Sequence, residues 1–397
     1  MRTIVHVTAD YPDPSVPNKT QAIKNLISAS HGYRHVVYSL NRVSNALGIS
    51  AIRFDNEATS LLYPAPPKGL MLKYCMDQVA EWIAHDLLVR KIEPDLFHAH
   101  KLTIEGLAAR KLAETFSRPF AVCIQGDTDL KVTKYKPGLR RVYCDIWNNA
   151  AYVFPFSIWA EKHFTSLFGF RKKPTRVLPC ITPQDTLLVS DPTPSKRIIS
   201  VFHLDSWKRK NARRLIEAVQ QASKENPGIA LDIYGSGSVA ARRGLLNCIK
   251  RINAEGIVRL KGSVAHDKVQ ETINTYSMFA LPSLRESFGM AAAEALMSGV
   301  PVLISKNWGI DGFFSEDEIG GICDPYSTRD MTEKIRSILA SESRLKSRIA
   351  DNQRSGKLDV FRTGSIVETY LAALGEIKSQ AVFRNEAIEP TNSVLQV

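Results

Sequence analysis

Two glutamates with seven residues between them, Glu286 and Glu294, stand in the segment "LPSLRESFGMAAAEALMSGVPVLIS", residues 281–305. The pattern predicts a strand, a short loop that carries Glu286, and a helix over about 289–298 that carries Glu294. Carboxylates accept hydrogen bonds, and a ribose diol matches a fixed carboxylate well, so sugar hydroxyls are the donors we expect here. The alternative is that Glu286 only balances the helix dipole and that Glu294 is a surface residue.

The start of the same helix is the second chemical feature. A helix that begins directly after a strand and a short loop presents free amide groups and a positive dipole end at the carboxyl edge of the sheet. Three alanines, 291–293, keep the helix narrow, so a ligand or the sheet can approach closely. A ligand with phosphate groups would fit this position.

A basic loop follows another predicted strand in "SVFHLDSWKRKNARRLIEAV", residues 200–219. A loop between a strand and a helix lies at the edge of the sheet where ligands bind, so Lys208 and Lys210 can project into a cleft. A solvated basic loop is the alternative, and for Arg209 and Arg213 we prefer it.

Two histidines, His98 and His100, flank Ala99 at the end of the strand in "EPDLFHAH". They share one face of the strand, but two ligands without a third make a weak metal site. We expect His98 to be a packed strand residue and His100, nearer the carboxyl end of the strand, to be a candidate for the cleft. The six cysteines are scattered singly, without the paired spacing of a zinc or redox motif, which suits a reducing cytoplasm.

The elements that position these residues form an α/β pattern, because apolar β-branched runs alternate with amphipathic helical ones over most of the chain. A proline-containing stretch interrupts the alternation once, which predicts a linker between two domains. We therefore expect a first domain at 1–183, a linker at 184–196, a second domain at 197–363, a C-terminal helix at 364–380 that could cross back to the first domain, and a mobile tail at 381–397.

Composition limits the classes of partner. The 397 residues include 52 basic and 40 acidic side chains, a formal charge of +12 that favours anionic partners. No helix-turn-helix, zinc-finger spacing or aromatic RNA-binding stretch is present, so nucleic acid ranks lowest. The chain has no apolar run long enough for a membrane-spanning helix, and its first apolar run is too short for a signal peptide and predicts a strand. A cytoplasmic protein is expected.

The segment 281–305 resembles the E-x7-E signature of the retaining, nucleotide-sugar-dependent glycosyltransferases with the GT-B fold, which build bacterial lipopolysaccharide and exopolysaccharide. Pieces that agree in order and spacing are "EPDLFHAH", "YGSGS", "VRLKGSV" and "DGFFSEDEIGGICDP". The likeness covers nearly the whole chain and is stronger in the second half. It implies two Rossmann-like α/β domains that face each other across a cleft, with the donor held mainly by the second and the acceptor by the first.

The resemblance also implies roles for the second domain. Glu294 would hold the ribose hydroxyls of the donor, and Glu286 would lie against the donor sugar. The amides of the loop residues would face that sugar or its phosphate, and a residue after "KGS" would lie beside the base. These remaining donor-binding residues are Phe288, Gly289, Met290 and Val264.

The resemblance also implies roles for the lysines of the basic loop and for two residues of the first domain. Lys210 would neutralise the leaving diphosphate, and Lys208 could replace an arginine of the family where His203 stands. In the first domain, Gln125 occupies the position of a family histidine, and Lys19 lies in a loop that lacks the family's glycine. Both are candidates on the acceptor side.

The function expected is therefore a metal-independent, retaining hexosyl transfer to a glycan or lipid-linked acceptor hydroxyl in cell-surface polysaccharide synthesis, with Glu286, Lys210 and His100 as catalytic candidates. No cofactor is expected, because no carboxylate pair is placed to hold a metal beside phosphates. The alternatives are a relative that hydrolyses or epimerises a nucleotide sugar and a non-catalytic member that binds a glycan or partner. A nicotinamide dehydrogenase is disfavoured, because no G-x-G-x-x-G follows the first strand.

Two stretches that mix cations with aromatic residues, "KVTKYKPGLRR" and "HFTSLFGFRKKPTR", lie in the first domain. Such a mixture can rest on an anionic lipid surface, where each cation contributes about 1 kcal/mol. A peripheral position at the inner face of the membrane stands beside the alternative of ordinary solvated charge.

Overall fold

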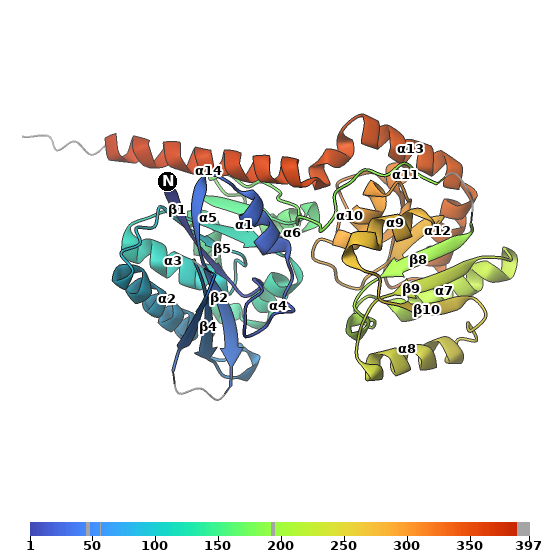
Figure 1. Ribbon diagram of the computed structural model, residues 1–397, viewed down its shortest axis with the longest axis horizontal. Helices are drawn as coiled ribbons and strands as arrows, with labels where there is room; N and C mark the ends of the chain where they lie inside the picture. Colours follow the sequence, from blue (N-terminus) through green and yellow to red (C-terminus); the bar gives the residue numbers. More distant parts are fainter. Residues whose placement is uncertain (45–47, 56, 192–194, 387–397) are drawn as a thin grey trace, which may run out of the picture.

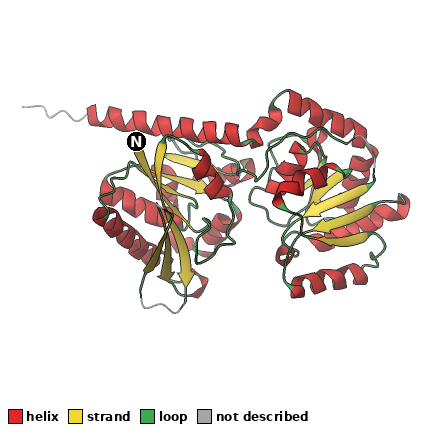
Figure 2. Ribbon diagram, in the orientation of Figure 1, coloured by secondary structure: helices red, strands yellow, loops and turns green. Residues whose placement is uncertain are grey.

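Two α/β domains lie side by side, and one long C-terminal helix extends from the second across the first (Figure 1). The computed structural model describes residues 1–44, 48–55, 57–191 and 195–386. In each domain the strands form a central sheet with helices packed around it (Figure 2). This is the GT-B arrangement that the sequence predicts.

The first domain contains a seven-stranded sheet in the order β3-β4-β2-β1-β5-β6-β7. Its strands are β1 Arg2–Thr8, β2 Tyr33–Val43, β3 Ser50–Phe54, β4 Ala58–Pro64, β5 Leu96–Ala99, β6 Phe120–Ile124 and β7 Tyr152–Pro155. All neighbours are parallel except β3 and β4, an edge hairpin that the sequence pattern did not indicate. Its helices are α1 Ala22–Ala29, α2 Leu72–Val89, α3 Glu105–Phe116, α4 Asp127–Tyr135, α5 Arg140–Asn149 and α6 Ile158–Phe168, with 3-10 turns η1 Pro67–Gly69 and η2 Pro137–Leu139.

The second domain contains a six-stranded parallel sheet in the order β10-β9-β8-β11-β12-β13. Its strands are β8 Arg197–Val201, β9 Ala230–Tyr234, β10 Val258–Gly262, β11 Met278–Leu281, β12 Val302–Ser305 and β13 Gly320–Cys323. The helices are α7 Ala212–Glu225, α8 Val239–Arg251, α9 Val269–Asn274, α10 Met290–Met297, α11 Glu316–Ile319, α12 Thr328–Ala340, α13 Glu342–Arg354 and α14 Thr363–Glu386. Three 3-10 turns, η3 Leu204–Ser206, η4 His266–Lys268 and η5 Lys357–Phe361, complete it.

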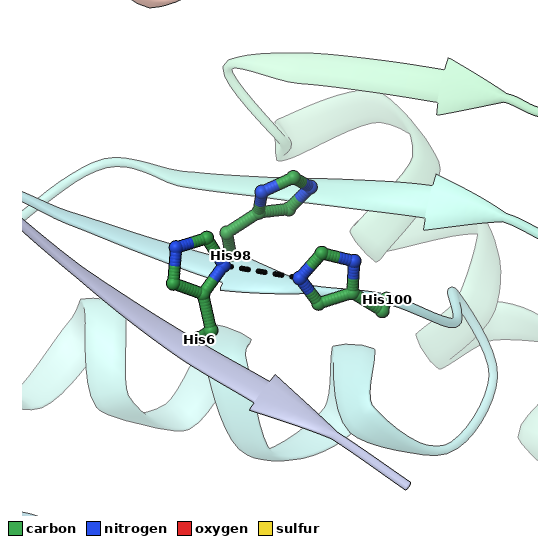
Figure 3. A group of neighbouring side chains, drawn as sticks. All are labelled: His6, His98 and His100. Carbon is green, nitrogen blue, oxygen red and sulfur yellow. Dashed lines mark hydrogen bonds between the residues drawn. The ribbon is translucent and has the colours of Figure 1, made fainter. Parts of the chain in front are cut away.

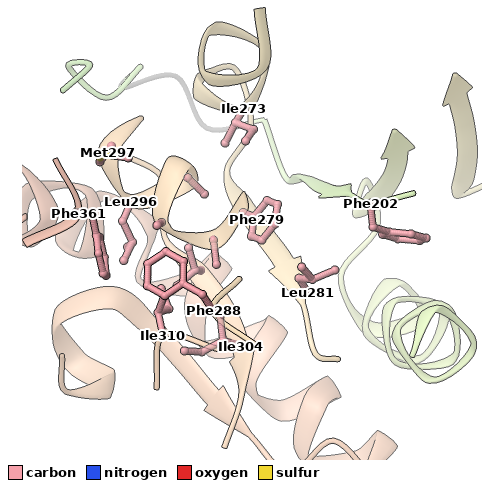
Figure 4. Close-up of a cluster of buried hydrophobic side chains, with 14 of the residues drawn as sticks. Phe202, Ile273, Phe279, Leu281, Phe288, Leu296, Met297, Ile304, Ile310 and Phe361 are labelled. Carbon is pink, nitrogen blue, oxygen red and sulfur yellow. The ribbon is translucent and has the colours of Figure 1, made fainter. Parts of the chain in front are cut away.

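The core of the second domain forms around α10, whose small and apolar side chains pack against the sheet (Figure 4). Phe288, Phe279 and Phe361 are fully or almost fully buried there. A parallel sheet is covered on both faces, which explains why its strands are continuous apolar runs. The packing fixes the loop before α10, because Phe288 anchors that loop in the core.

Helix α14 joins the two domains. Arg2 donates to the carbonyl of Leu374 at 3.2 Å, and Glu376 accepts hydrogen bonds from Tyr152 and Arg176. The helix continues to Glu386, six residues beyond the end that the sequence predicted, so the start of the expected mobile tail is helical. The rest of that tail, 387–397, lies outside the described residues.

Among the described residues, none of the helices combines the length and the apolar character that crossing a bilayer requires.

Candidate active site

A cavity of about 380 Å³ lies between the two domains, where the carboxyl ends of strands from both sheets meet. The first domain contributes side chains after β1, β6 and β7, and the second domain contributes the loops after β8 and β11. The lining residues are Asp10, Thr20, Ala22, Ile23, Gln125, Phe156 and Cys180, together with Val201, Lys210, Leu281, Glu286, Ser287, Phe288, Gly289, Met290 and Ala291. Ligands in open α/β sheets bind at this edge, so the cavity is the candidate active site.

The loop between β11 and α10 forms one wall of the cavity. Gly289 precedes the helix with φ 82°, in the left-handed region that favours glycine, and a Cβ there would lie 3.3 Å from Cγ of Glu286. The first amides of the helix, at Met290 and Ala291, have no partner within the helix. Both residues line the cavity, so the helix presents its positive end to a ligand there.

Lys210 and Glu286 form a salt bridge inside the cavity, and each side chain is largely buried. Ser283 donates a hydrogen bond to the same Glu286 carboxylate at 3.1 Å. Asn211, next to Lys210, has φ 58° and donates to the carbonyl of Pro282 at 3.0 Å. The loop after β8 is thereby fixed to the loop after β11, and a cation and a carboxylate are held together at the helix N-terminus.

Glu294 lies in α10 and is only 7% exposed. Its carboxylate has no side-chain hydrogen bond among the described residues, and burial raises its pKa to about 7. A buried carboxylate without a partner is unfavourable unless a ligand supplies hydrogen-bond donors. Glu294 does not itself line the cavity, but Met290 and Ala291, one turn earlier, do.

The first domain contributes Asp10, which the sequence analysis did not single out although it lies two residues after the first strand. Asp10 forms an ion pair with the buried Lys101. Burial alone would raise the pKa of Asp10, but Lys101 and a hydrogen bond from Gln125 hold it below its ordinary value. Beneath this pair, burial raises the pKa of Glu105 to about 7. Gln125, an expected acceptor-side residue, therefore lies in the cavity beside a carboxylate.

The structure places His100 elsewhere. Its side chain is fully buried in the first domain, within 3.0 Å of His6, and it does not line the cavity. His100 follows β5 directly, but its side chain shares the face of the sheet on which His98 lies, and that face is covered. The expected position in the cleft is therefore wrong.

Three other predicted residues also lie away from the cavity. Lys19 turns into the first domain and forms an ion pair with Asp13 at 2.8 Å. Lys208 is exposed, with its ammonium group 5.7 Å from the ring centre of Trp207. Val264 is half-buried and packs against the core of the second domain. The described structure therefore brings Gln125, Lys210, Glu286 and the loop before α10 together, but not these three.

Direct contacts hold the domains against each other beside the cavity. Trp159 of α6 donates to the carbonyl of Ser287 at 3.0 Å, and its ring centre lies 4.6 Å from that of Trp308. Gly126 lies under Trp159 with φ 108°, and a Cβ there would come within 2.5 Å of the indole ring. A side chain at position 126 would therefore displace the indole ring that contacts Ser287 of the second domain.

Comparison with known proteins gives two results. The family model for glycosyl transferases group 1 matches residues 189–356. A UDP-N-acetylglucosamine–peptide N-acetylglucosaminyltransferase GtfA subunit from Streptococcus pneumoniae is 31% identical over 136 residues, 34% of this chain and 26% of that protein. The chain thus matches only about a quarter of that relative's length.

Solved structures match nearly the whole chain. Sucrose-phosphate synthase from Thermosynechococcus elongatus superposes with a TM-score of 0.70 at 18% identity, covering 96% of this chain and all of that one. Anabaena HepE in complex with UDP gives a TM-score of 0.68 at 16% identity, with 95% and 100% coverage. At these identities the likeness establishes the fold of both domains together.

Proposed function

We propose that the protein transfers a sugar from a nucleoside diphosphate donor to an acceptor hydroxyl, with retention of configuration, because residues 189–356 match the family model for glycosyl transferases group 1 and the whole chain has the GT-B fold. The observation that carries the proposal is the position of Lys210 at the N-terminus of α10, inside the cavity between the domains. A cation and free amides together form a site for a diphosphate.

The donor would lie with its diphosphate against Lys210 and the amides of Met290 and Ala291. In the reaction the bond between the anomeric carbon and the diphosphate breaks, and a bond to the acceptor oxygen forms. The proton of the acceptor hydroxyl passes to the departing diphosphate. Fixed positive charge beside the leaving group stabilises the charge that develops there, so in this proposal the protein's own groups do the electrostatic work without a metal.

The two glutamates take different parts in this arrangement. Glu286, held by Lys210 and Ser283, would face the donor sugar, where positive charge develops at the anomeric carbon. Glu294, buried one turn into α10, would accept hydrogen bonds from the ribose hydroxyls. A ligand of this kind would supply the donors that the Glu294 carboxylate lacks.

The acceptor would enter from the first domain. A second cavity of about 270 Å³ lies there, with a mainly apolar lining that includes Tyr63, Leu72 and Ile104. Its cations are Arg42, Lys68, Lys131 and Lys136. An apolar cavity edged by cations suits an anionic amphiphile. We therefore favour a lipid-linked acceptor and a role in cell-surface polysaccharide synthesis.

Helix α4 connects the two cavities. Its N-terminal side begins next to Gln125 in the first cavity, and its C-terminal residue Tyr135 lines the second. The exposed apolar side chains Leu70, Met71 and Tyr74 lie near the second cavity in sequence and would make a peripheral contact with an anionic membrane.

The decisive experiment is a thermal-shift screen against nucleotides and nucleotide sugars, followed by transfer assays with the donor that binds. A ligand at a hundred times its dissociation constant should stabilise the protein by about 2.7 kcal/mol. No stabilisation by any nucleotide would contradict the proposal. Sugar release without an acceptor would favour the alternative of a hydrolase, and binding without turnover would favour a non-catalytic protein.

A further inference from the structure

Three histidines of the first domain meet on one covered face of its sheet (Figure 3). His6 of β1 and His98 of β5 are direct neighbours in the register of the two strands, and His100 follows on the same face. The ring centres of His98 and His100 are 4.4 Å apart, and that of His6 is 5.3 Å from His100. None of the three side chains is exposed to solvent.

The nitrogen atoms of these rings are close enough to share one ion. One nitrogen from each ring lies within 4.8 Å of the others, and Nδ1 of His6 is 3.0 Å from Nε2 of His100. In a tetrahedral zinc site with bonds of about 2.0–2.1 Å, ligand nitrogens are about 3.3 Å apart. Small ring movements would therefore bring the three nitrogens to coordination distance.

Cys123 of β6 lies on the neighbouring strand, outside this group. Its Sγ is 3.2 Å from Nε2 of His98 and 3.8 Å from Nδ1 of His100, whereas His6 meets the other nitrogen of His100. Among the described residues, the group of possible ligands is therefore the three histidines. Imidazole nitrogens are ligands that suit zinc and related transition-metal ions.

The outer nitrogens of two of the rings have partners that point their inner nitrogens toward this group. Nε2 of His6 lies 2.9 Å from Nδ1 of His35, whose other nitrogen lies 2.8 Å from the carbonyl of Ser30. Nδ1 of His98 lies 2.8 Å from the hydroxyl of Tyr370. Histidines that bind metals almost always have such a second partner, which fixes the tautomer and the ring orientation.

We propose that His6, His98 and His100 bind one divalent transition-metal ion of the zinc class, at a buried site apart from the candidate active site. None of the three residues lines the cavity of the candidate active site. Through His98 and Tyr370 the ion would link the sheet of the first domain to α14, which comes from the second. This inference does not depend on the proposed transfer reaction.

The alternative is that the same side chains form a metal-free chain of hydrogen bonds. Neutral rings can make every one of these contacts. The chain runs from the hydroxyl of Tyr370 to His98, then through Cys123 and the other rings to the carbonyl of Ser30. The two arrangements use almost the same positions and differ in metal content.

The test is elemental analysis of the full chain, expressed with added Zn²⁺ and purified without a histidine tag or chelator. We expect about one equivalent of metal per chain that survives dialysis, and under about a tenth of an equivalent in His98→Gln and His100→Gln. His163→Gln and Cys144→Ser, which change an exposed histidine and a half-buried cysteine elsewhere in the same domain, should keep the metal.

A second measurement decides the matter if the variants fail to fold. The wild-type chain expressed or refolded with Co²⁺ should show the intense visible bands of a four-coordinate ion, with three imidazole ligands and a water molecule in the fourth position. Wild-type protein without stoichiometric metal under both loading conditions would overturn the proposal. Stoichiometric metal that both histidine variants retain would also overturn it.

Discussion

Lys210 and Glu286 form an ion pair inside the cavity between the domains, although they are 76 positions apart in the sequence. The loop after β8 carries the cation and the loop after β11 carries the carboxylate. A bound diphosphate would share Lys210, so the pair holds the lysine in place before the donor arrives. The side chains that we place at the leaving group and at the donor sugar thus support each other.

Lys210→Ala should therefore lower turnover about 100- to 1000-fold, the loss typical when one group that stabilises developing charge is removed. Arg213→Ala is the matched control, because Arg213 in the following helix is exposed and pairs with Glu217. Steady-state kinetics with the donor found by thermal shift would measure both. Equal and small losses in the two variants would contradict the assignment of Lys210.

The two glutamates should give separable kinetics. Glu286→Gln should mainly lower turnover at saturating donor, because its contact strengthens as charge develops. Glu294→Gln should mainly raise the donor KM, because contacts with ribose are alike in the ground and transition states. Circular dichroism would establish that both variants fold. The reverse pattern, or no effect in folded protein, would show that the carboxylates are structural.

Stability should depend on pH through Glu294. Its pKa is about 7 in the folded protein and near 4.5 when unfolded, so the folded state binds more protons between these values and stability falls as pH rises through them. Glu294→Gln removes this penalty. The free energy of unfolding of the variant minus that of the wild type should therefore be larger at pH 8 than at pH 5, by up to about 3 kcal/mol. Urea unfolding at both pH values measures the difference, and a pH-independent difference would contradict the shift.

The contact between the domains should be sensitive to Gly126. In Gly126→Ala the new methyl group would meet the ring of Trp159, and the residue would have to keep a positive φ. We expect a loss of more than about tenfold in kcat/KM, because domain closure assembles the site. Gly138→Ala is the control, since a Cβ there meets nothing within 4 Å. Equal activity of the two variants would show that this contact is not needed.

Membrane contact should be electrostatic if it occurs. The protein should sediment with anionic vesicles at low salt and be released as salt rises, because screening shortens the range of surface charge. Charge reversal of Lys131 and Lys136, which line the apolar cavity of the first domain, should weaken sedimentation more than reversal of Lys224. Binding to neutral vesicles alone, or to none, would remove membrane contact from the proposal but would leave the transfer reaction untouched.

The α/β class followed from the alternation of apolar and amphipathic runs, and the GT-B arrangement was implied by the family resemblance; the fold confirms both. The strands expected before the basic loop and before Glu286 are β8 and β11, and the loop with Glu286 lies at the predicted edge of the sheet. The hairpin of β3 and β4 did not follow from the pattern; β3 is a short edge strand whose side chains are mostly exposed, so it lacks an apolar run. The roles of the individual site residues stay predictions.

The local sequence pattern alone predicted the loop and the helix that follow a strand, because a strand, a tight loop and a helix are encoded by neighbouring residues. It therefore identified Glu286, Lys210 and the start of α10. The pairing of distant strands, their register and the helices that pack on each face of the sheet decide which side chains meet. His100 was for that reason expected in the cleft but lies under a covered face, where it meets His6, 94 positions away. A histidine's sequence neighbours do not say which strand pairs beside it, so only the tertiary structure could add the third imidazole to the two that the sequence showed.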